Sequence, residues 1–306
     1  MTSTPVIDVD RLHLSYGDFH AVKDLSFQVE KGELYALLGT NGAGKTSTLE
    51  TVEGHRTATS GTVRVFGRSP RDRTAVRPRM GIMLQESGFS PDLTVKESIR
   101  LFGKLSQRAD RVERLLGVVD LTDKAGTQVS QLSGGEKRRL DFATAVYGQP
   151  ELVFLDEPTT GLDIQSRDAV WDAVDKLRED GSTVVLTTHY LEVAQQRAAR
   201  IGLMHQGALH KEGTVAELTR TLPAAIRFTL PGPGPGPSPA PASASVPALP
   251  FPATRESDGR LVVETFALQK DLHTLLGWAH AHAVELGELQ AGPTRLDDVF
   301  RSISTE

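Results

Sequence analysis

Short apolar runs alternate with longer amphipathic segments over about the first 220 residues of the chain. Runs rich in β-branched residues predict strands, and the spaced apolar positions between them predict helices, a combination typical of an α/β domain. Strands are expected at residues 6–14, 25–29, 34–38, 63–66, 152–155, 183–187 and 201–204. The run at 34–38 leads directly into a glycine-rich segment, so a strand followed by a loop is predicted there.

One stretch inside this domain has a helical rather than a strand pattern. Between residue 93 and about residue 121 the spacing is helical, and the residues available for a buried face are Ile99, Leu101, Phe102, Leu105, Val112, Leu115 and Leu116. We therefore predict a first domain at residues 1–220, with a helical subdomain at about 86–145 inserted between its two strand-rich parts.

The composition changes after residue 220. Residues 231–252 hold nine of the 17 prolines, in an alternation with Gly that lacks the period of three found in collagen. An extended tether is predicted, and a proline-rich docking segment is the alternative. Residues 224–230 and 261–266 are predicted to pair as a hairpin across it, because a longer loop costs little extra closure entropy. With helices expected at 269–284 and 296–303, residues 221–306 form a small C-terminal α+β domain.

Composition and charge exclude several classes of protein. The net charge of −5 and the pI of about 6.0 provide no basic field for nucleic acid. The absence of cysteine excludes disulfides and thiolate metal sites and suits a reducing compartment. We see no secretory signal, and no apolar stretch approaches the ~18 residues that cross a bilayer. A cytoplasmic chain without a nucleic acid partner is expected.

A candidate phosphate-binding loop, called the P-loop below, follows the strand at 34–38. It consists of Gly39, Thr40, Asn41, Gly42, Ala43, Gly44, Lys45, Thr46 and Ser47. The glycines allow backbone N–H groups to surround phosphate oxygens, and a helix expected to begin at Lys45 adds its positive end. Lys45 is predicted to neutralise the β- and γ-phosphates, and Thr46 to bind Mg²⁺. A plain glycine-rich turn is the weaker interpretation, so a nucleoside triphosphate site is predicted.

Two adjacent acids end the apolar run at 152–155. Asp156 is expected at the carboxyl end of a buried strand, where a carboxylate that binds Mg²⁺ belongs. Glu157 follows at once and is placed to polarise an attacking water as general base. Adjacent acids can also merely cap a strand, but that interpretation is weak beside a P-loop.

The segment LSGGE at residues 132–136 decides between the classes of P-loop protein. It continues as LSGGEKRRLDFATAV and is followed by LVFLDEPTTGLD and TTHY. In this order and spacing the chain resembles the nucleotide-binding subunits of ABC transporters over about residues 5–220. The resemblance implies an α/β fold with a P-loop NTPase core of ABC type, a helical subdomain and the small C-terminal domain. It also implies an ATPase whose hydrolysis of ATP is coupled to transmembrane transport.

In this family, two ATP molecules are sandwiched between two nucleotide-binding subunits. The resemblance implies that the signature residues Ser133, Gly134 and Gly135 meet the γ-phosphate held by the P-loop of the opposite subunit. Because one chain carries both half-sites, a homodimer is the simpler expectation, and a monomer should hydrolyse ATP slowly. The implied partner is a separate transmembrane permease, which would hold the chain at the inner face of the cell membrane.

Four further residues match functional positions of the family. Tyr16 matches the aromatic that stacks on adenine, although an aromatic packed in the core is the alternative. Gln85 matches the glutamine that reaches Mg²⁺ and the attacking water, and joins the core to the helical insert that meets the membrane partner. Asp163 matches the acid at the contact between subunits. His189 matches the switch histidine, which contacts the γ-phosphate and steadies the water.

The segments GIMLQESGF, LETVEG and TRLDDVF are similar to those of ATPases that pair with six-helix export permeases. These include the daunorubicin-resistance-like antibiotic exporters of actinobacteria, which implies export of drugs or other hydrophobic compounds. The alternative is a non-transport ABC ATPase acting on ribosomes or DNA. It is disfavoured because the chain has a single such domain and no long coiled coil between P-loop and signature. A module that binds ATP without cleaving it is disfavoured by Glu157 and His189.

Overall fold

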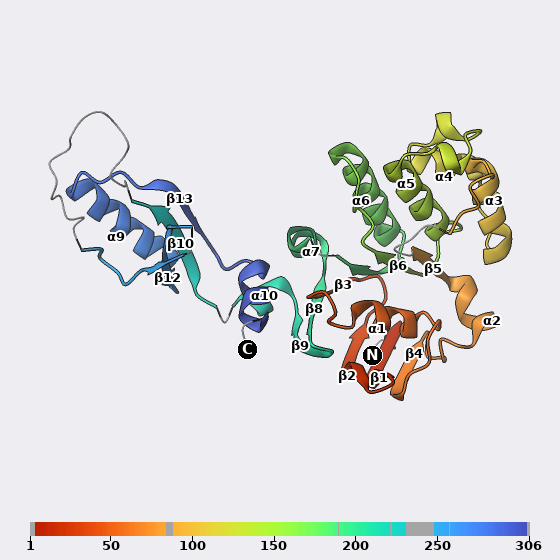
Figure 1. Cartoon of the computed structure of the whole chain (residues 1–306), viewed down its shortest axis with the longest axis horizontal. Coiled ribbons are helices and arrows are strands. Elements are labelled where there is room, and N and C mark those ends of the chain that lie inside the picture. The colour runs from red at the N-terminus through yellow and green to blue at the C-terminus, as the bar shows by residue number, and fades with distance from the viewer. Residues whose placement is uncertain are drawn as a thin grey trace. The chain divides into compact units, whose positions relative to one another are not determined.

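The computed structural model describes residues 4–83, 88–188, 190–220, 222–230, 248–256 and 258–304. The chain divides into two compact units (Figure 1), Met1–Val215 with Ile303–Glu306 and Ala216–Ser302. Within the described ranges, no helix is both long enough and apolar enough to cross a membrane.

A six-stranded sheet lies at the centre of the first unit, in the order β5-β6-β7-β3-β8-β9. The strands are β3 (Leu34–Gly39), β5 (Met80–Met83), β6 (Leu152–Asp156), β7 (Thr183–Thr187), β8 (Arg200–His205) and β9 (Ala208–Gly213). All neighbours pair in parallel except β8 and β9, which are antiparallel. Parallel strands buried on both faces need continuous apolar runs, as in β3, β6 and β7. The loops after β3 and β6 therefore leave the sheet at the same edge.

An antiparallel sheet in the order β2-β1-β4 packs over one face of this central sheet. Its strands are β1 (Ile7–Tyr16), β2 (Phe19–Val29) and β4 (Ser60–Val65). Helix α1 (Lys45–Val52) lies between the two sheets (Figure 1), and its Leu49 and Val52 share one buried apolar cluster with Leu12, Leu37 and Phe154. This packing fixes the start of α1, and with it the end of the P-loop.

Helices α5 (Gly134–Ala145), α6 (Ile164–Glu179) and α7 (Leu191–Arg197) pack on strands of the central sheet. Helices α3 (Val95–Ser106) and α4 (Val112–Val118) pack on α5. The shorter elements are α2 (Arg73–Val76), η1 (Arg77–Arg79), η2 (Thr122–Lys124), η3 (Val129–Gln131) and α8 (Val215–Thr219). Helices α3, α4 and α5 lie between β5 and β6 in the chain and form the helical insert.

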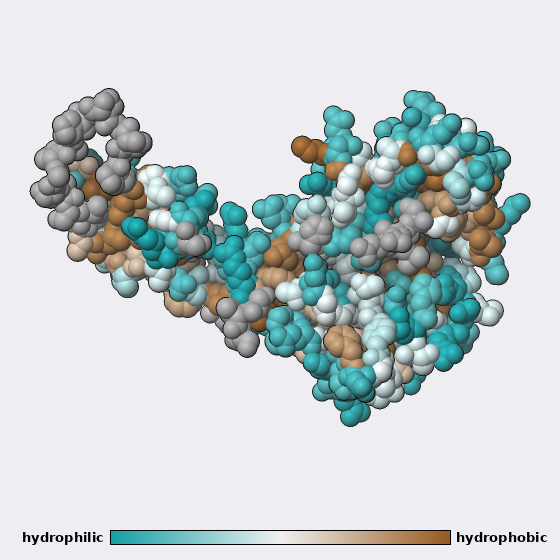
Figure 2. Space-filling model, in the orientation of Figure 1, coloured by the Kyte–Doolittle hydropathy of each residue, from teal (hydrophilic) through white to brown (hydrophobic). Residues whose placement is uncertain are grey.

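Only some of the apolar residues available for a buried face of the insert are buried. Ile99, Leu115 and Leu116 are buried, whereas Leu101 is 44% and Leu105 70% exposed. These two leucines are four residues apart and so share a side of α3 that points away from Ile99. Figure 2 shows apolar surface over α3. The period of the pattern identified the helix but not the width of its buried face.

The second unit contains a four-stranded sheet in the order β11-β12-β10-β13. The strands are β10 (Ala224–Thr229), β11 (Thr254–Arg255), β12 (Leu261–Thr265) and β13 (Gly287–Gly292), followed in the chain by helix α9 (Leu268–Ala281) after β12 and helix α10 (Leu296–Ser304) after β13. The last residues of α10, from Ile303, belong to the first unit. The antiparallel pairing of β10 with β12, from Ala224↔Thr265 to Phe228↔Leu261, confirms the predicted hairpin. Most of the predicted tether, residues 231–247, lies outside the described residues. Helix α9 covers one face of the sheet, around Leu275.

Candidate nucleotide site

The P-loop joins β3 to α1, which begins at Lys45 as the sequence predicts. Two of its glycines are required by close packing. A Cβ at Gly39 would lie 2.5 Å from the carbonyl oxygen of Met204, and one at Gly44 would lie 2.5 Å from that of Ala21. Gly44 also has a φ of 94°, in the left-handed region that favours glycine. The loop is therefore held tightly between β2 and β8.

The ammonium of Lys45 lies over the loop that carries it. Its Nζ donates to the carbonyl oxygens of Gly39 at 2.7 Å and Thr40 at 3.1 Å. Burial lowers the pKa of Lys45, and the nearby carboxylates of Glu157 and Asp156 oppose that shift. A positive charge is thus held, partly desolvated, where the phosphates of a nucleotide would meet it.

One pocket of about 330 Å³ brings most of the predicted residues together. It is lined by Tyr16, Phe19, Ala21, Asn41, Gly42, Ala43, Gly44, Lys45, Thr46, Ser47, Asp156 and Glu157. Phe19 and Ala21 were not predicted from the sequence. Phe19 is strongly exposed, and the signal that the sequence offers for it is an aromatic residue three positions after Tyr16.

Tyr16 is 43% exposed, unlike an aromatic packed in the core. Its hydroxyl and the Oγ of Ser47 share a hydrogen bond of 2.9 Å. The guanidinium carbon of Arg56 lies 4.5 Å from the centre of the ring, and the Nε of Arg56 donates to Glu50 at 2.9 Å. Arg56 and Glu50 are not among the residues that line the pocket, so they support the ring from outside it.

The two acids sit at the end of β6. The carboxylate of Asp156 accepts a hydrogen bond from the Thr187 hydroxyl. Glu157 has a φ of 50°, and its N–H donates to the carbonyl of Thr187 at 3.0 Å. The Oε2 of Glu157 accepts from the hydroxyls of Thr160 at 3.3 Å and Thr188 at 3.4 Å. These threonines were not predicted from the sequence, and they hold both carboxylates in the lining of the P-loop pocket.

The signature residues begin helix α5 and stay outside this pocket. Ser133 and Glu136 form a capping box, in which Ser133 Oγ accepts from the Glu136 N–H at 3.2 Å and Glu136 Oε2 accepts from the Ser133 N–H at 2.8 Å. Ser133 and Gly134 are exposed. None of the described residues that line the P-loop pocket belongs to the signature.

Asp163 caps α6, where its carboxylate accepts from the N–H of Ser166 at 2.9 Å and from its hydroxyl at 2.8 Å. The N–H contact is the main cause that lowers the pKa of this exposed carboxyl. Gln85 and His189 lie outside the described residues.

Both units of the chain match known families that are described in terms of ABC transporters. Residues 22–160 match the family described as "ABC transporter". Residues 224–294 match the "ABC transporter domain-containing protein-like, C-terminal domain". A solved structure described as the "ATP binding subunit of ABC transporter" superposes with a TM-score of 0.66 at 25% identity, over 71% of this chain and 92% of that one.

Three relatives bear names that include an ATP-binding role. Daunorubicin resistance ATP-binding protein DrrA3 of Streptomyces coeruleorubidus is 41% identical over 218 residues, or 69% of each chain. Nod factor export ATP-binding protein I of Paraburkholderia xenovorans is 39% identical over 69% of this chain and 72% of its own. Linearmycin resistance ATP-binding protein LnrL of Bacillus subtilis is 31% identical over 305 residues, 98% of each chain. Agreement along nearly the whole length extends the likeness beyond the nucleotide pocket to both units, and the chain therefore belongs to the ATP-binding subunits of ABC transporters.

Proposed function

We propose that this ATPase powers export through a separate membrane permease, and that its cargo is a drug or another hydrophobic compound. The observation that carries the ATPase mechanism is the single pocket shared by the P-loop, Tyr16, Asp156 and Glu157. The export direction and the drug class are supported by relatives named for linearmycin resistance, daunorubicin resistance and Nod factor export. The permease would keep the chain peripheral at the membrane.

Within the pocket, the proposed roles follow from the chemistry of each group. Backbone N–H groups of residues 39–47 and the Lys45 ammonium bind the phosphates, and the Tyr16 ring stacks on adenine. Glu157 takes the proton of the attacking water, with His189 assigned to steady that water. The Thr46 hydroxyl and the Asp156 carboxylate line the same pocket and are hard oxygen ligands that fit Mg²⁺, with Gln85 as the third assigned ligand. When bound, Mg²⁺ neutralises charge on the β- and γ-phosphates.

We assign the complete site to a homodimer. Ser133, Gly134 and Gly135 lie at the exposed start of α5 and outside the P-loop pocket of their own chain. This arrangement supports the assignment of these residues to the γ-phosphate bound by a partner copy. Asp163, exposed at the start of α6, is assigned to the contact between the two copies.

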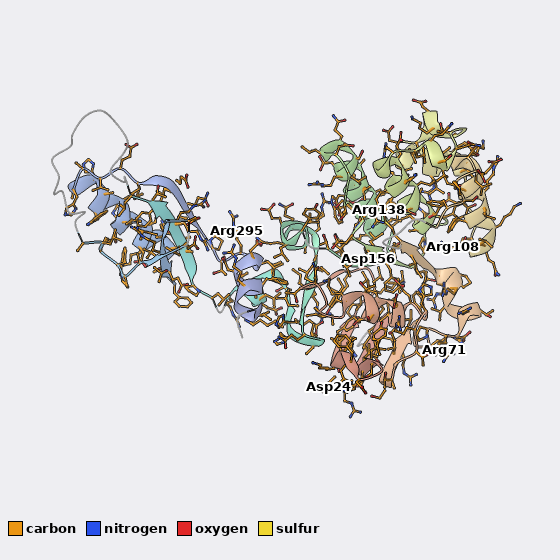
Figure 3. The ribbon with its side chains drawn as sticks, viewed as in Figure 1. Asp24, Arg71, Arg108, Arg138, Asp156 and Arg295 are labelled. Atoms are coloured by element: carbon orange, nitrogen blue, oxygen red, sulfur yellow. The ribbon has the colours of Figure 1, made fainter. Side chains whose placement is uncertain are left out.

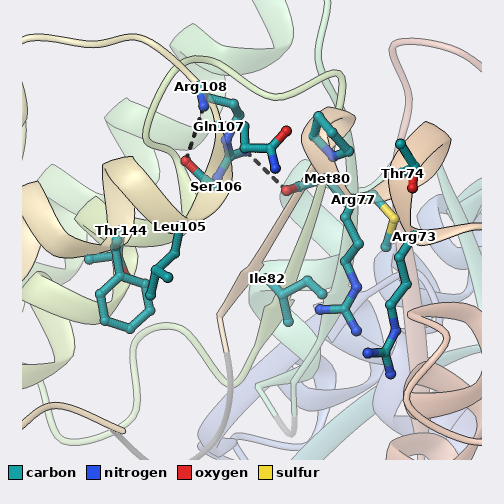
Figure 4. Close-up of a pocket in the computed structure, with 12 residues that line it drawn as sticks. Arg73, Thr74, Arg77, Met80, Ile82, Leu105, Ser106, Gln107, Arg108 and Thr144 are labelled. Atoms are coloured by element: carbon teal, nitrogen blue, oxygen red, sulfur yellow. Dashed lines mark hydrogen bonds between the residues drawn. The ribbon is translucent and has the colours of Figure 1, made fainter.

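A groove of about 430 Å³ in the first unit is the proposed docking site for the permease. It lies between residues 73–82 and helix α3, and Figure 4 shows the side chains that line it. Leu105 and Ile82 supply apolar surface, while Arg73, Arg77 and Arg108 supply positive charge. Burial and the neighbouring charge of Arg73 lower the pKa of Arg77. A basic and apolar groove fits an amphipathic segment of the permease that carries acidic residues.

Reversing the charge of this groove tests the docking proposal. The double variant Arg73→Glu/Arg77→Glu should lose co-purification with the permease from its own genome, and also the rise in ATPase rate on assembly. Its basal ATPase rate should match that of the wild type, because neither residue lines the nucleotide pocket. The control is Arg71→Glu, an exposed arginine near the groove but not part of its lining. Equal permease binding by the double variant and the control would refute the proposed groove.

An ATPase rate raised by ribosomes or DNA, with no permease complex, would favour the non-transport alternative.

The contact between Arg56 and Tyr16 leads to a kinetic prediction. Arg56→Ala should raise the KM for ATP about 2- to 5-fold with kcat nearly unchanged, since a cation–π contact at an exposed site contributes ~0.5–1 kcal/mol. The KM for ATP of Arg56→Lys should lie between those of the wild type and Arg56→Ala. Steady-state ATPase assays measure both values, with the exposed Arg64→Ala as control. A change in kcat without a change in KM would place Arg56 elsewhere in the mechanism.

A further inference from the structure

Arg138 is a buried arginine on α5, a little more than one helical turn after the signature residue Ser133. It is only 8% exposed. Its Nη2 donates to two main-chain carbonyls, that of Asp156 and, at 2.7 Å, that of Glu157. Figure 3 shows Arg138 beside Asp156. Burial lowers the pKa of Arg138, and Asp141, Asp156 and Glu157 oppose that shift. A cation is thus buried against the backbone that carries the general base.

The backbone of Glu157 needs such support. A φ of 50° is in the left-handed region, which costs a residue other than glycine roughly 1–2 kcal/mol. The conformation is held by the Glu157 N–H, which donates to Thr187 at 3.0 Å, and by a Glu157 carbonyl that accepts from the Thr160 N–H at 3.3 Å as well as from Arg138. Since the side chain leaves from this backbone, these bonds determine where the carboxylate points.

The same helix carries the signature. The capping box of Ser133 and Glu136 completes the first turn of α5, so a displacement of Ser133 is transmitted along the helix to Arg138. In the proposed homodimer, Ser133 meets the ATP on the partner's P-loop, whereas Glu157 serves the ATP on its own. Helix α5 is therefore in contact with one nucleotide at its start and with the base of the other site one turn later.

We propose that Arg138 is a positioning residue that couples the ATP at the signature of one site to the orientation of Glu157 in the other. This inference rests on the proposed role of Glu157 as general base. A shift of α5 changes the hydrogen bonds from Arg138 to the two carbonyls, and with them the direction of the carboxylate. Hydrolysis then proceeds fully only when both sites of the dimer hold ATP.

The test compares Arg138→Gln with the wild type as full-length chains. We expect kcat to fall about 10- to 100-fold, because a displacement of ~1 Å at a catalytic group has effects of this size. The KM for ATP should stay within about twofold, and the Hill coefficient for ATP should fall toward one. Arg138→Lys keeps the charge but lacks the forked guanidinium. Its kcat and Hill coefficient should therefore lie between those of the wild type and those of Arg138→Gln.

A matched control separates this role from simple stabilisation. Arg200 also donates to a main-chain carbonyl, that of Gln28 at 3.0 Å, and lies at the opposite end of the central sheet from the P-loop. Arg200→Gln should lower the melting temperature while leaving kcat and the Hill coefficient unchanged. If Arg138→Gln does not fold, Arg138→Lys takes its place in the comparison. A normal kcat, or a lowered kcat with an unchanged Hill coefficient, overturns the coupling role.

A double-mutant cycle with Glu157→Gln distinguishes failure of this inference from failure of the proposed mechanism. If Arg138 acts through Glu157, adding Arg138→Gln to Glu157→Gln leaves the residual rate unchanged. A further fall of the same size as in the wild type would show that Arg138 acts elsewhere, with Glu157 still the base. Normal hydrolysis by Glu157→Gln alone would instead contradict the proposed base, and the inference with it.

Discussion

Glu157→Gln should lower kcat for ATP hydrolysis about 10²- to 10⁴-fold, the usual contribution of a positioned general base. The amide that replaces the carboxylate has nearly the same shape but cannot take a proton from the attacking water. The P-loop and Lys45 are unchanged, so ATP should still bind. With hydrolysis blocked, the two copies should stay closed around ATP, and size-exclusion chromatography with ATP should show a stable dimer.

The matched control is Glu151→Gln, which lies just before the other end of the same strand, β6. Glu151 makes a bidentate ion pair with Arg79, whose Nε donates to Oε1 at 2.6 Å and whose Nη2 donates to Oε2 at 2.8 Å. Its loss should cost at most about 1 kcal/mol of stability, as for exposed ion pairs, and leave kcat unchanged. Steady-state hydrolysis by Glu157→Gln at the rate of this control would refute the assignment of the base.

Lys45→Ala should lower the affinity for ATP about 10²-fold or more, so that ATP no longer binds at concentrations that saturate the wild type. The reason is that charge-assisted hydrogen bonds to phosphate are stronger than hydrogen bonds between neutral groups. Titration with a fluorescent ATP analogue measures this directly. The melting temperature without nucleotide should not fall, since the substitution removes a partly buried charge. The rise in melting temperature that ATP gives the wild type should disappear.

Lys23→Ala is the control, because Lys23 is an exposed lysine on β2, the strand that packs against Gly44 of the P-loop. It should keep the ATP affinity of the wild type and its ATP-dependent rise in melting temperature. Tight ATP binding by Lys45→Ala would exclude the P-loop as the phosphate site.

The strands and helix ends that a short segment determines by itself were predicted best from the sequence. The strand at 183–187 and the start of a helix at Lys45 were both confirmed. The edge strand β13 was missed because its sequence, GELQAG, lacks the apolar alternation of a strand that packs on a core. The roles assigned to Gln85 and His189 stay predictions, since both lie outside the described residues.

The parts of the site that sequence did not reveal depend on tertiary contacts. In the chain Arg138 belongs to a basic run, KRR, that resembles any solvated helix face. Only the packing of α5 against β6 brings its guanidinium to the carbonyls of Asp156 and Glu157. Arg56 reaches the ring of Tyr16 in the same way, through the fold of the loop between α1 and β4. Neither contact has a local pattern that periodicity or motif spacing could detect.

The pairing of β10 with β12 makes the second unit a convenient place for protein engineering. The alignment of these strands is set by their antiparallel ladder and by side chains packed on α9, rather than by the length of chain that joins them. A peptide epitope or a fluorescent protein inserted between Pro239 and Ala240 should therefore leave this sheet intact, and with it the first unit, which is a separate compact unit. Such a fusion would let assembly with candidate permeases be followed inside living cells.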